Sequence, residues 1–303
     1  MENFIATLAY LLIGLGLRHL STMHRDSGQV LNAYVIHISL PALVLLKVPP
    51  LSFSGDLLIL VLMPWVVLAL SWALVVAVAR LMAWDRPTTG CMLLLVPLAN
   101  TAFLGIPMVR AFLGEPAIPY ALVYDQFGSF IALTTYGSLI LVLYGSGAAK
   151  PTVAALVRHV VTFPPFIALV VALLLRGTTY PLLAQSLLQH LADTLVPVVM
   201  VAVGFQLSLR LSREVLGQLT IGLAIKLVIA PLAGLLLCRW WGIEGVVAQV
   251  AVFEAAMPPM VAAGAMAISV NLAPSLAAAM VGVGVLMSFV TLPLLHRLLV
   301  YLY

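Results

Sequence analysis

Ten apolar segments, each near the length of a membrane-spanning helix, constrain the fold of this 303-residue chain more than any other feature. A helix needs roughly 20 apolar residues to cross the hydrocarbon core of a bilayer. The segments lie at 3–18, 28–48, 57–79, 88–112, 117–144, 162–176, 180–207, 214–238, 245–270 and 274–300. Because 64% of the residues are hydrophobic and 8% are charged, too little polar surface remains for a water-soluble fold. We therefore predict an all-α polytopic membrane protein with ten transmembrane helices.

Basic residues predict the orientation of these helices, because lysine and arginine collect in cytoplasmic loops. The loops after odd-numbered segments carry Arg18, Arg25, Arg80, Arg86, Lys150, Arg158, Arg210 and Arg213. The opposite face carries Lys47, Arg110, Arg176, Arg239 and Arg297. This bias predicts a multi-pass protein of the cell membrane with both termini extracytoplasmic. The net charge of +4 is explained by loop residues near lipid headgroups, so no nucleic-acid partner is expected.

Two Pro-Met-Val stretches, Pro107–Val109 and Pro259–Val261, lie half a chain apart and indicate an internal duplication. Aligning them places the first five segments over the last five. An odd number of helices per repeat requires the second copy to be inserted upside down. We predict a first repeat over 1–145, a short central loop over 146–157 and an inverted second repeat over 158–303.

The paired prolines predict that the fourth and ninth helices are broken. A proline in a helix removes one backbone donor and crowds the preceding turn, so we expect unwinding around Gly105–Pro107 and Met257–Pro259, with the two breaks crossing near mid-bilayer. The freed amides would face an anion and the freed carbonyls a cation. The predicted substrate-binding residues are Asn100, Thr101, Gly105, Ile106, Pro107, Met108, Met257, Pro258, Pro259 and Met260. Ordinary proline kinks in packed helices are the alternative.

Ionisable and amide side chains at membrane depth are candidates for ion coupling, because they are costly there unless paired, protonated or bound to a cation. The candidates are Glu254, Asp125, Gln126 and Lys226, with sodium near Glu254 and Asn100, or a proton, as the coupling ion; no other cofactor is expected. We expect Lys226 to need a partner such as Glu254, Asp125 or Asp193, as a structural ion pair or a coupling element. Asn100 and Thr101 have an alternative role as interhelical hydrogen-bonding groups.

No motif predicts an enzyme. Tyr124–Asp125 resembles the first motif of intramembrane aspartyl proteases, but Gly282–Val285 lacks the aspartate of the second. A channel should show repeated polar or charged rings along several helices, and none is seen.

Four stretches together resemble the auxin efflux carrier family, and the resemblance covers essentially the whole chain. They are Leu31–Val35 followed by Leu40–Leu43, Asn100–Pro107, Phe163–Pro165 and Glu254–Pro259. Bacterial members with a short central loop look like permeases for malate, malonate and related organic anions. The plant PIN-type relatives export auxin, which is also an organic anion.

The resemblance implies a ten-helix fold shared with sodium–bile acid symporters. Helices 1, 2, 6 and 7 would form a scaffold that mediates a homodimer, and helices 3–5 and 8–10 a mobile transport domain that moves like an elevator. Glu254 occupies a place similar to that of a sodium-binding glutamate in those symporters. They carry a glutamine and an asparagine after that glutamate, whereas this chain has Met257–Pro259.

We therefore predict a secondary transporter for a small organic anion, such as a dicarboxylate or an auxin-like acid, that works by elevator-type alternating access. Coupling to protons or sodium is one alternative. An uncoupled, potential-driven anion exporter or a channel-like facilitator is the other.

Overall fold

The computed structural model of the chain describes residues 2–24, 26–51, 55, 57–146, 152–207 and 213–302. Within these ranges the protein is helical and contains no strand, which confirms the all-α prediction. Arg25, Lys150 and Arg210, which entered the charge analysis, lie outside the described residues, as do 147–151 of the predicted central loop.

The helices of the first half follow one another with short connections. They are α1 (Glu2–Leu17), α2 (Ser27–Tyr34), η1 (Val35–Ser39), α3 (Leu40–Lys47), α4 (Leu57–Leu81), α5 (Arg86–Leu95), η2 (Thr101–Gly105), α6 (Ile106–Phe112), η3 (Glu115–Ala117), α7 (Ile118–Tyr124), η4 (Asp125–Ser129), α8 (Phe130–Ala132), η5 (Leu133–Gly137) and α9 (Ser138–Tyr144). Asp85 caps the start of α5, where its side chain accepts a hydrogen bond from the Thr88 amide.

The helices of the second half begin with α10, which starts inside the predicted central loop. They are α10 (Val153–Val161), α11 (Pro164–Leu174), α12 (Leu182–Asp193), α13 (Leu195–Gln206), η6 (Arg213–Val215), α14 (Leu216–Ala224), η7 (Ile225–Ile229), α15 (Ala230–Trp240), α16 (Gly245–Ala255), α17 (Val261–Ser269) and α18 (Pro274–Leu302). Residues 153–157, predicted to be loop, belong to α10. The Thr152 hydroxyl caps this helix by accepting a hydrogen bond from the Ala155 amide, an N-cap signal that the sequence contains.

Six helical runs in the described residues are long and apolar enough to cross a membrane, and α10 with α11, bent by 61°, make a seventh if counted as one span. This confirms a multi-pass membrane protein. Shorter apolar helices cover Glu2–Leu17, Thr101–Phe112 and Gly245–Ala255, so the count of ten spans stays a prediction.

Three prolines lie directly after π-helical turns rather than at helix breaks. Pro41 follows η1, Pro107 follows η2 and Pro231 follows η7, each as the second residue of the next α-helix. A π-turn is wider than an α-turn, and the irregular hydrogen bonding there accommodates the missing proline amide. The expected unwinding at Gly105–Pro107 is therefore wrong, because the helix continues through Pro107.

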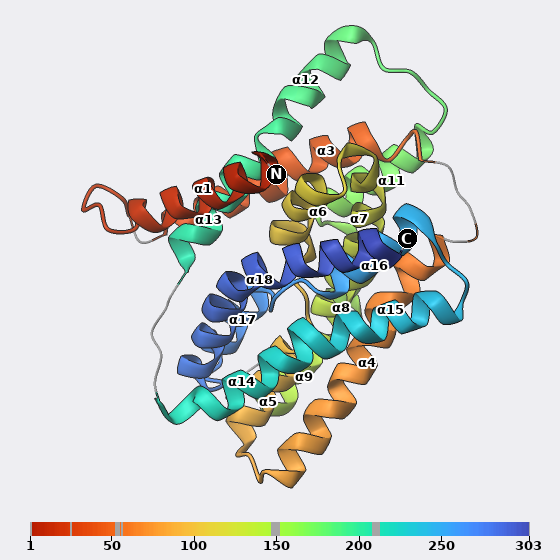
Figure 1. Ribbon diagram of the computed structural model, residues 1–303. Helices are drawn as coiled ribbons and strands as arrows, with labels where there is room; N and C mark the ends of the chain where they lie inside the picture. Colours follow the sequence, from red (N-terminus) through yellow and green to blue (C-terminus); the bar gives the residue numbers. More distant parts are fainter. Residues whose placement is uncertain are drawn as a thin grey trace.

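The helices pack in two groups (Figure 1). The first group contains α1, α2, η1, α3, α11, α12 and α13, which pack mainly against one another. The second group contains α4, α5, α7–α9 with their π-turns, and α14–α18. The two groups meet along α6 and η2, which contact α1 and α13.

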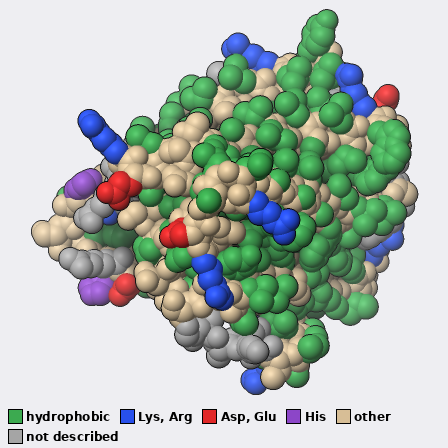
Figure 2. All heavy atoms as spheres, turned by 90° about the horizontal axis from the view of Figure 1, so that it is seen from below, with side chains coloured by type: hydrophobic (Ala, Val, Ile, Leu, Met, Phe, Trp, Pro, Cys, Tyr) green, Lys and Arg blue, Asp and Glu red, His purple; other side chains and the backbone are tan. Residues whose placement is uncertain are grey.

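Hydrophobic side chains cover most of the face shown in Figure 2, and the charged side chains there are scattered. Exposed leucine, isoleucine and valine residues occur on nearly every long helix, for example Leu58, Leu182, Leu236 and Val290. Such a surface is suited to lipid contact.

Candidate functional site

Two breaks in the helices lie at Val96–Asn100 and Ala256–Met260. α5 ends at Leu95, immediately before Val96-Pro97, and α16 ends at Ala255, shortly before Pro258-Pro259. Val96 itself is still helical (φ −71°, ψ −45°), whereas Pro97 has no amide to continue the helix and its ring crowds the preceding turn. The break of the first half is therefore caused by Pro97, and the segment that corresponds to Met257–Pro259 is Pro97–Ala99 rather than Gly105–Pro107.

The two breaks cross and are joined by backbone hydrogen bonds. The Asn100 amide donates to the Pro258 carbonyl (2.9 Å), and the Met260 amide donates to the Leu98 carbonyl (3.1 Å). Ala99 and Pro259 form an isolated antiparallel bridge. Non-helical backbone at membrane depth needs such partners because lipid offers none.

A cavity of about 270 Å³ lies beside this crossing. Its polar lining residues are Asn100, Asp125 and His159. The others are apolar and come from both packing groups: Ile36, Leu40, Ala102, Phe103, Phe130, Leu133, Phe163, Met260 and Ala262. The helical stretches that begin at Thr101 and Val261 both start at this cavity, since Asn100 and Met260 are the residues that precede them. Their free amino-terminal ends carry partial positive charge.

Asn100 has an unused hydrogen-bond donor. The residue is 2% exposed, and its Nδ2 has no hydrogen-bond partner among the described residues. Thr101 is already engaged, because its hydroxyl donates to Oδ1 of Asp125 (2.5 Å). The second oxygen of Asp125, Oδ2, accepts from Nε2 of Gln126 (2.7 Å). An acceptor group on a ligand would therefore meet the Asn100 amide, whereas both carboxylate oxygens of Asp125 already have partners.

Glu254, in the last turn of α16, is fully buried against η2. Neither of its carboxylate oxygens has a hydrogen-bond partner in the part of the chain that is described. A Cβ atom added at Gly105 would lie 2.7 Å from Oε1 of Glu254. Gly105 thus permits the close approach of this carboxyl group to η2. A buried carboxyl group without partners is protonated or binds a cation.

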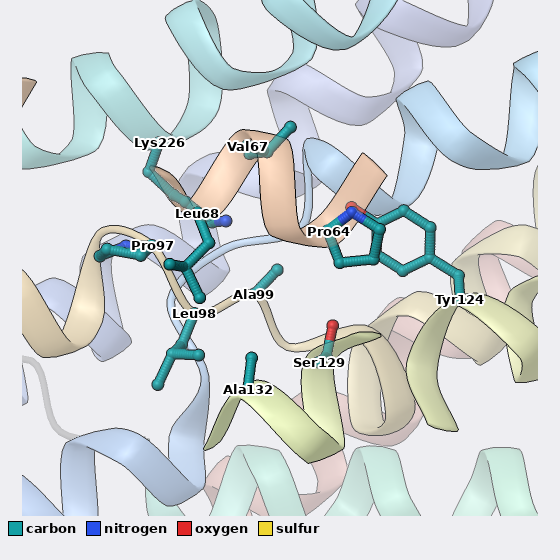
Figure 3. A pocket seen from close by; sticks show the side chains of 10 residues that line it. All are labelled: Pro64, Val67, Leu68, Pro97, Leu98, Ala99, Tyr124, Ser129, Ala132 and Lys226. Carbon is teal, nitrogen blue, oxygen red and sulfur yellow. The ribbon is translucent and has the colours of Figure 1, made fainter. Parts of the chain in front are cut away.

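Lys226, in η7, is also fully buried, and its Nζ has no hydrogen-bond partner within the described ranges. It lines a small cavity of about 10 Å³ together with Pro97, Leu98 and Ala99 of the first break (Figure 3), which has room for about one water molecule. The expectation that Lys226 pairs with Glu254, Asp125 or Asp193 is wrong for the described structure. Asp193 pairs instead with Arg110.

Several predicted binding residues lie away from the cavity. Asn100 and Met260 line it, whereas Ile106, Met108 and Met257 are buried in the hydrophobic core. Pro107 lines a different cleft, of about 370 Å³, between α1, α6 and α13. Pro258 and Pro259 hold the backbone of the crossing.

A network of charged residues lies at the other end of α6, beside that second cleft. Glu115 accepts from Nζ of Lys47 (2.7 Å) and from Nε of Arg110 (2.5 Å). Asp193 accepts from Nη2 of Arg110 (3.1 Å) and from Nε2 of Gln189 (2.9 Å). All four charged side chains of this network are partly exposed.

Phe130, His159 and Phe163 are among the cavity residues that the sequence does not predict. The rings of Phe130 and Phe163 stack with centroids 3.9 Å apart, and the His159 ring lies 6.2 Å from Phe130. The predicted central loop ends at residue 157, whereas His159 belongs to the short α10 helix, which begins at Val153. Its N-cap threonine was the signal that could have revealed it.

The sequence is similar to known membrane transporters along its whole length. A family model described as "Membrane transport protein" matches residues 1–296. An "Uncharacterized transporter" of Methanothermobacter thermautotrophicus is 25% identical over 296 residues, which cover 97% of this chain and 96% of the relative. A second "Uncharacterized transporter", from Methanocaldococcus jannaschii, is 24% identical over 268 residues, or 85% of each chain.

Proposed function

Because the chain belongs to the membrane transport protein family, which includes the auxin efflux carriers, we propose that it is a secondary carrier that moves a small organic anion by alternating access. That membership also confirms that the protein is a transporter and not an enzyme. We further propose that the helical segments form ten spans in two inverted repeats of five. In this arrangement both termini are extracytoplasmic.

The observation that carries the proposal is the unused donor of Asn100 in the cavity at the crossing. A buried polar group without a partner costs free energy of about 1–3 kcal/mol. A substrate carboxylate that accepts a hydrogen bond from Nδ2 of Asn100 would remove this cost. The amino-terminal ends at Thr101 and Val261 favour negative charge at the same place.

The apolar lining indicates what the rest of the substrate is like. Phe103, Phe130, Phe163 and Met260 surround the cavity, and such side chains favour an apolar or aromatic body. The volume of about 270 Å³ suits a small molecule. A carboxylate attached to a compact carbon skeleton meets both requirements.

The packing of the helices supports an elevator-type movement. The cavity lies between the two packing groups, since Ile36 and Leu40 come from the first group and Phe130 and Ala262 from the second. In the proposed mechanism the first group is the scaffold, which also forms a homodimer, and the second group carries the substrate across. Sliding of the second group would expose Asn100 to each side of the membrane in turn.

Coupling is proposed to involve Glu254, with the buried Asp125, Gln126 and Lys226 as further candidates. A proton on Glu254, or a sodium ion near Glu254 and Asn100, would neutralise the carboxylate during the movement. Uncoupled export is the alternative, since one unit charge moved through 100 mV is worth about 2.3 kcal/mol.

The test is uptake into proteoliposomes with a panel of radiolabelled monocarboxylates and dicarboxylates. Sodium, pH and potential gradients are imposed one at a time, so that the coupling ion is identified by the gradient that drives uptake. We expect saturable uptake of at least one carboxylate. Transport of neutral solutes or cations, without any carboxylate, would refute the proposal.

A substitution at Asn100 tests whether uptake depends on the cavity at the crossing. Asn100→Leu, which keeps the volume but removes the donor, should raise KM at least about tenfold, because a hydrogen bond to a charged group contributes about 1.5–3 kcal/mol. Asn32→Leu is the matched control, because Asn32 also has an unpartnered side-chain oxygen but does not line the cavity.

A further inference from the structure

The cavity at the crossing contains one polar side chain that the proposed function leaves unused. His159 of α10 lines the cavity together with Asn100 and Phe130. α10 leads directly into α11 of the first packing group and also contacts η5 of the second. His159 is exposed as well as lining the cavity, so its imidazole lies at the mouth.

Aromatic rings line the cavity next to its mouth at His159. Phe130 lies between His159 and Phe163, with ring centroids 6.2 Å from His159 and 3.9 Å from Phe163. The Phe130–Phe163 pair is a stacked contact with planes 14° apart. The cavity is therefore polar at Asn100 and at His159, with an apolar lining that includes this pair.

We infer that His159 is a substrate-binding residue that holds the end of the anion opposite to the end held by Asn100. This inference rests on the proposed function. The remaining polar residue of the cavity lining, Asp125, already has partners for both of its carboxylate oxygens. A second acceptor group on the substrate therefore finds its donor at the imidazole, which donates whether neutral or protonated.

The inference specifies a substrate class. A two-ended site suits a carboxylate that carries a second carboxylate or another strong acceptor at the far end of a short carbon body. A monocarboxylate with an apolar far end would leave His159 unused. The site thus distinguishes dicarboxylates from monocarboxylates of similar size.

No other ionisable side chain on the described elements packed against α10 takes this role. α10 itself carries Arg158, which does not line the cavity. η5 carries Tyr136, whose hydroxyl donates to the Leu93 carbonyl, and α11 carries no ionisable side chain. His159 is therefore the donor for the second acceptor group of the substrate.

The experiment measures KM and kcat for [14C]glutarate and [14C]phenylacetate in proteoliposomes. His159→Leu removes the hydrogen-bond donor, and His159→Lys keeps one. Arg158→Gln is the matched control, because it removes a charge from the neighbouring residue of α10, which does not line the cavity.

His159→Leu should raise the KM for glutarate at least about tenfold, as expected for the loss of a hydrogen bond to a charged carboxylate. His159→Lys, which keeps a donor, should retain a low KM for glutarate. kcat, the KM for phenylacetate and the Arg158→Gln variant should change little.

Three results would overturn the inference while leaving the transporter proposal intact. They are an unchanged glutarate KM in His159→Leu, an equal effect of Arg158→Gln, and uptake of phenylacetate without glutarate. Absence of uptake for both probes, together with no uptake of any carboxylate in the wider panel, would refute the proposed function itself and the inference with it.

Discussion

The two ends of the helical stretch from Thr101 to Phe112 differ in whether the ionisable side chains beside them have partners. At the Arg110 end, Lys47, Arg110, Glu115 and Asp193 are partly exposed, and each has a partner of opposite charge. At the Thr101 end, the fully buried Glu254 lies against η2, and its carboxylate oxygens have no partner among the described residues.

This distribution is the reverse of what stability alone favours. Exposed ion pairs contribute little, typically below about 1 kcal/mol, whereas buried ionisable groups without partners are expensive. A side chain kept at such a cost is a candidate for function. We therefore expect function to depend on the crossing, whereas the network at Arg110 is a structural contact between the first packing group and the segment from α6 to η3.

The largest expected effect concerns the contact between Gly105 and Glu254. Gly105→Ala would place a Cβ atom 2.7 Å from Oε1 of Glu254, and overpacking of this kind costs about 1–3 kcal/mol, more than the gain of up to about 1 kcal/mol that alanine brings to a helix. We expect a lower melting temperature in detergent and reduced uptake.

Gly137→Ala is the matched control for this prediction. Gly137 also lies in a π-turn, but the nearest atoms to its added Cβ lie at 3.4 Å or more. Adding Glu254→Ala to Gly105→Ala should restore the melting temperature. Equal melting temperatures for the two glycine variants would show that Glu254 does not lie tightly against η2.

Glu254 and Glu115 allow a direct comparison of the two regions. Glu254→Gln, nearly the same shape, should leave the fold intact and reduce ion-coupled uptake at least about tenfold, equivalent to roughly 1.4 kcal/mol. Glu115→Gln should change uptake much less, because water screens its ion pairs. Uptake and melting temperature are measured for both. A stable Glu254→Gln protein with unimpaired transport in every gradient would remove Glu254 from the mechanism.

Lys226→Met tests whether the buried amine is unpaired. Replacing an unpaired buried ammonium by an apolar side chain of similar length should leave the melting temperature unchanged or raise it, by the equivalent of about 1 kcal/mol. A clear fall in the melting temperature, reversed in the double variant Lys226→Met with Glu254→Gln, would reveal an ion pair and contradict the described arrangement.

The smallest effect is expected at the charged network. Arg110→Gln should lower the free energy of unfolding by less than about 1 kcal/mol, and the difference from the natural protein should shrink in high salt because exposed charges are screened. Thermal unfolding at low and high salt measures this. A large, salt-insensitive loss of stability would mean that the network is effectively buried in the membrane protein.

The sequence correctly predicts the second break at Met257–Pro259. It predicts the first break at Gly105–Pro107, whereas the structure has it at Val96–Asn100. The match between the two Pro-Met-Val stretches favours Pro107 as the site of the first break, although Pro97 lies in the same predicted segment, 88–112. The two prolines differ in what precedes them, a π-turn before Pro107 and an ending α-helix before Pro97. Hydrogen-bond patterns of this kind depend on packing and cannot be read from residue identity.

The candidate site was predictable in part for a similar reason. Asn100 and Asp125 were found because polar side chains are rare in apolar segments. His159 could not be predicted in this way, because a histidine at the edge of an amphipathic segment has the same sequence pattern as a solvent-exposed surface residue. Its position at the cavity depends on the 61° bend between α10 and α11, which is a property of the tertiary structure.

The crossing is held by main-chain hydrogen bonds between Asn100 and Pro258 and between Met260 and Leu98, and this has a consequence for how such proteins diverge. Amide and carbonyl groups are the same in nearly every residue, so substitutions in the surrounding side chains can accumulate without disturbing the frame. Side chains that line the cavity, such as Phe130, can change while the crossing keeps its shape. Distantly related transporters can in this way accept different substrates on an unaltered frame of two crossed segments.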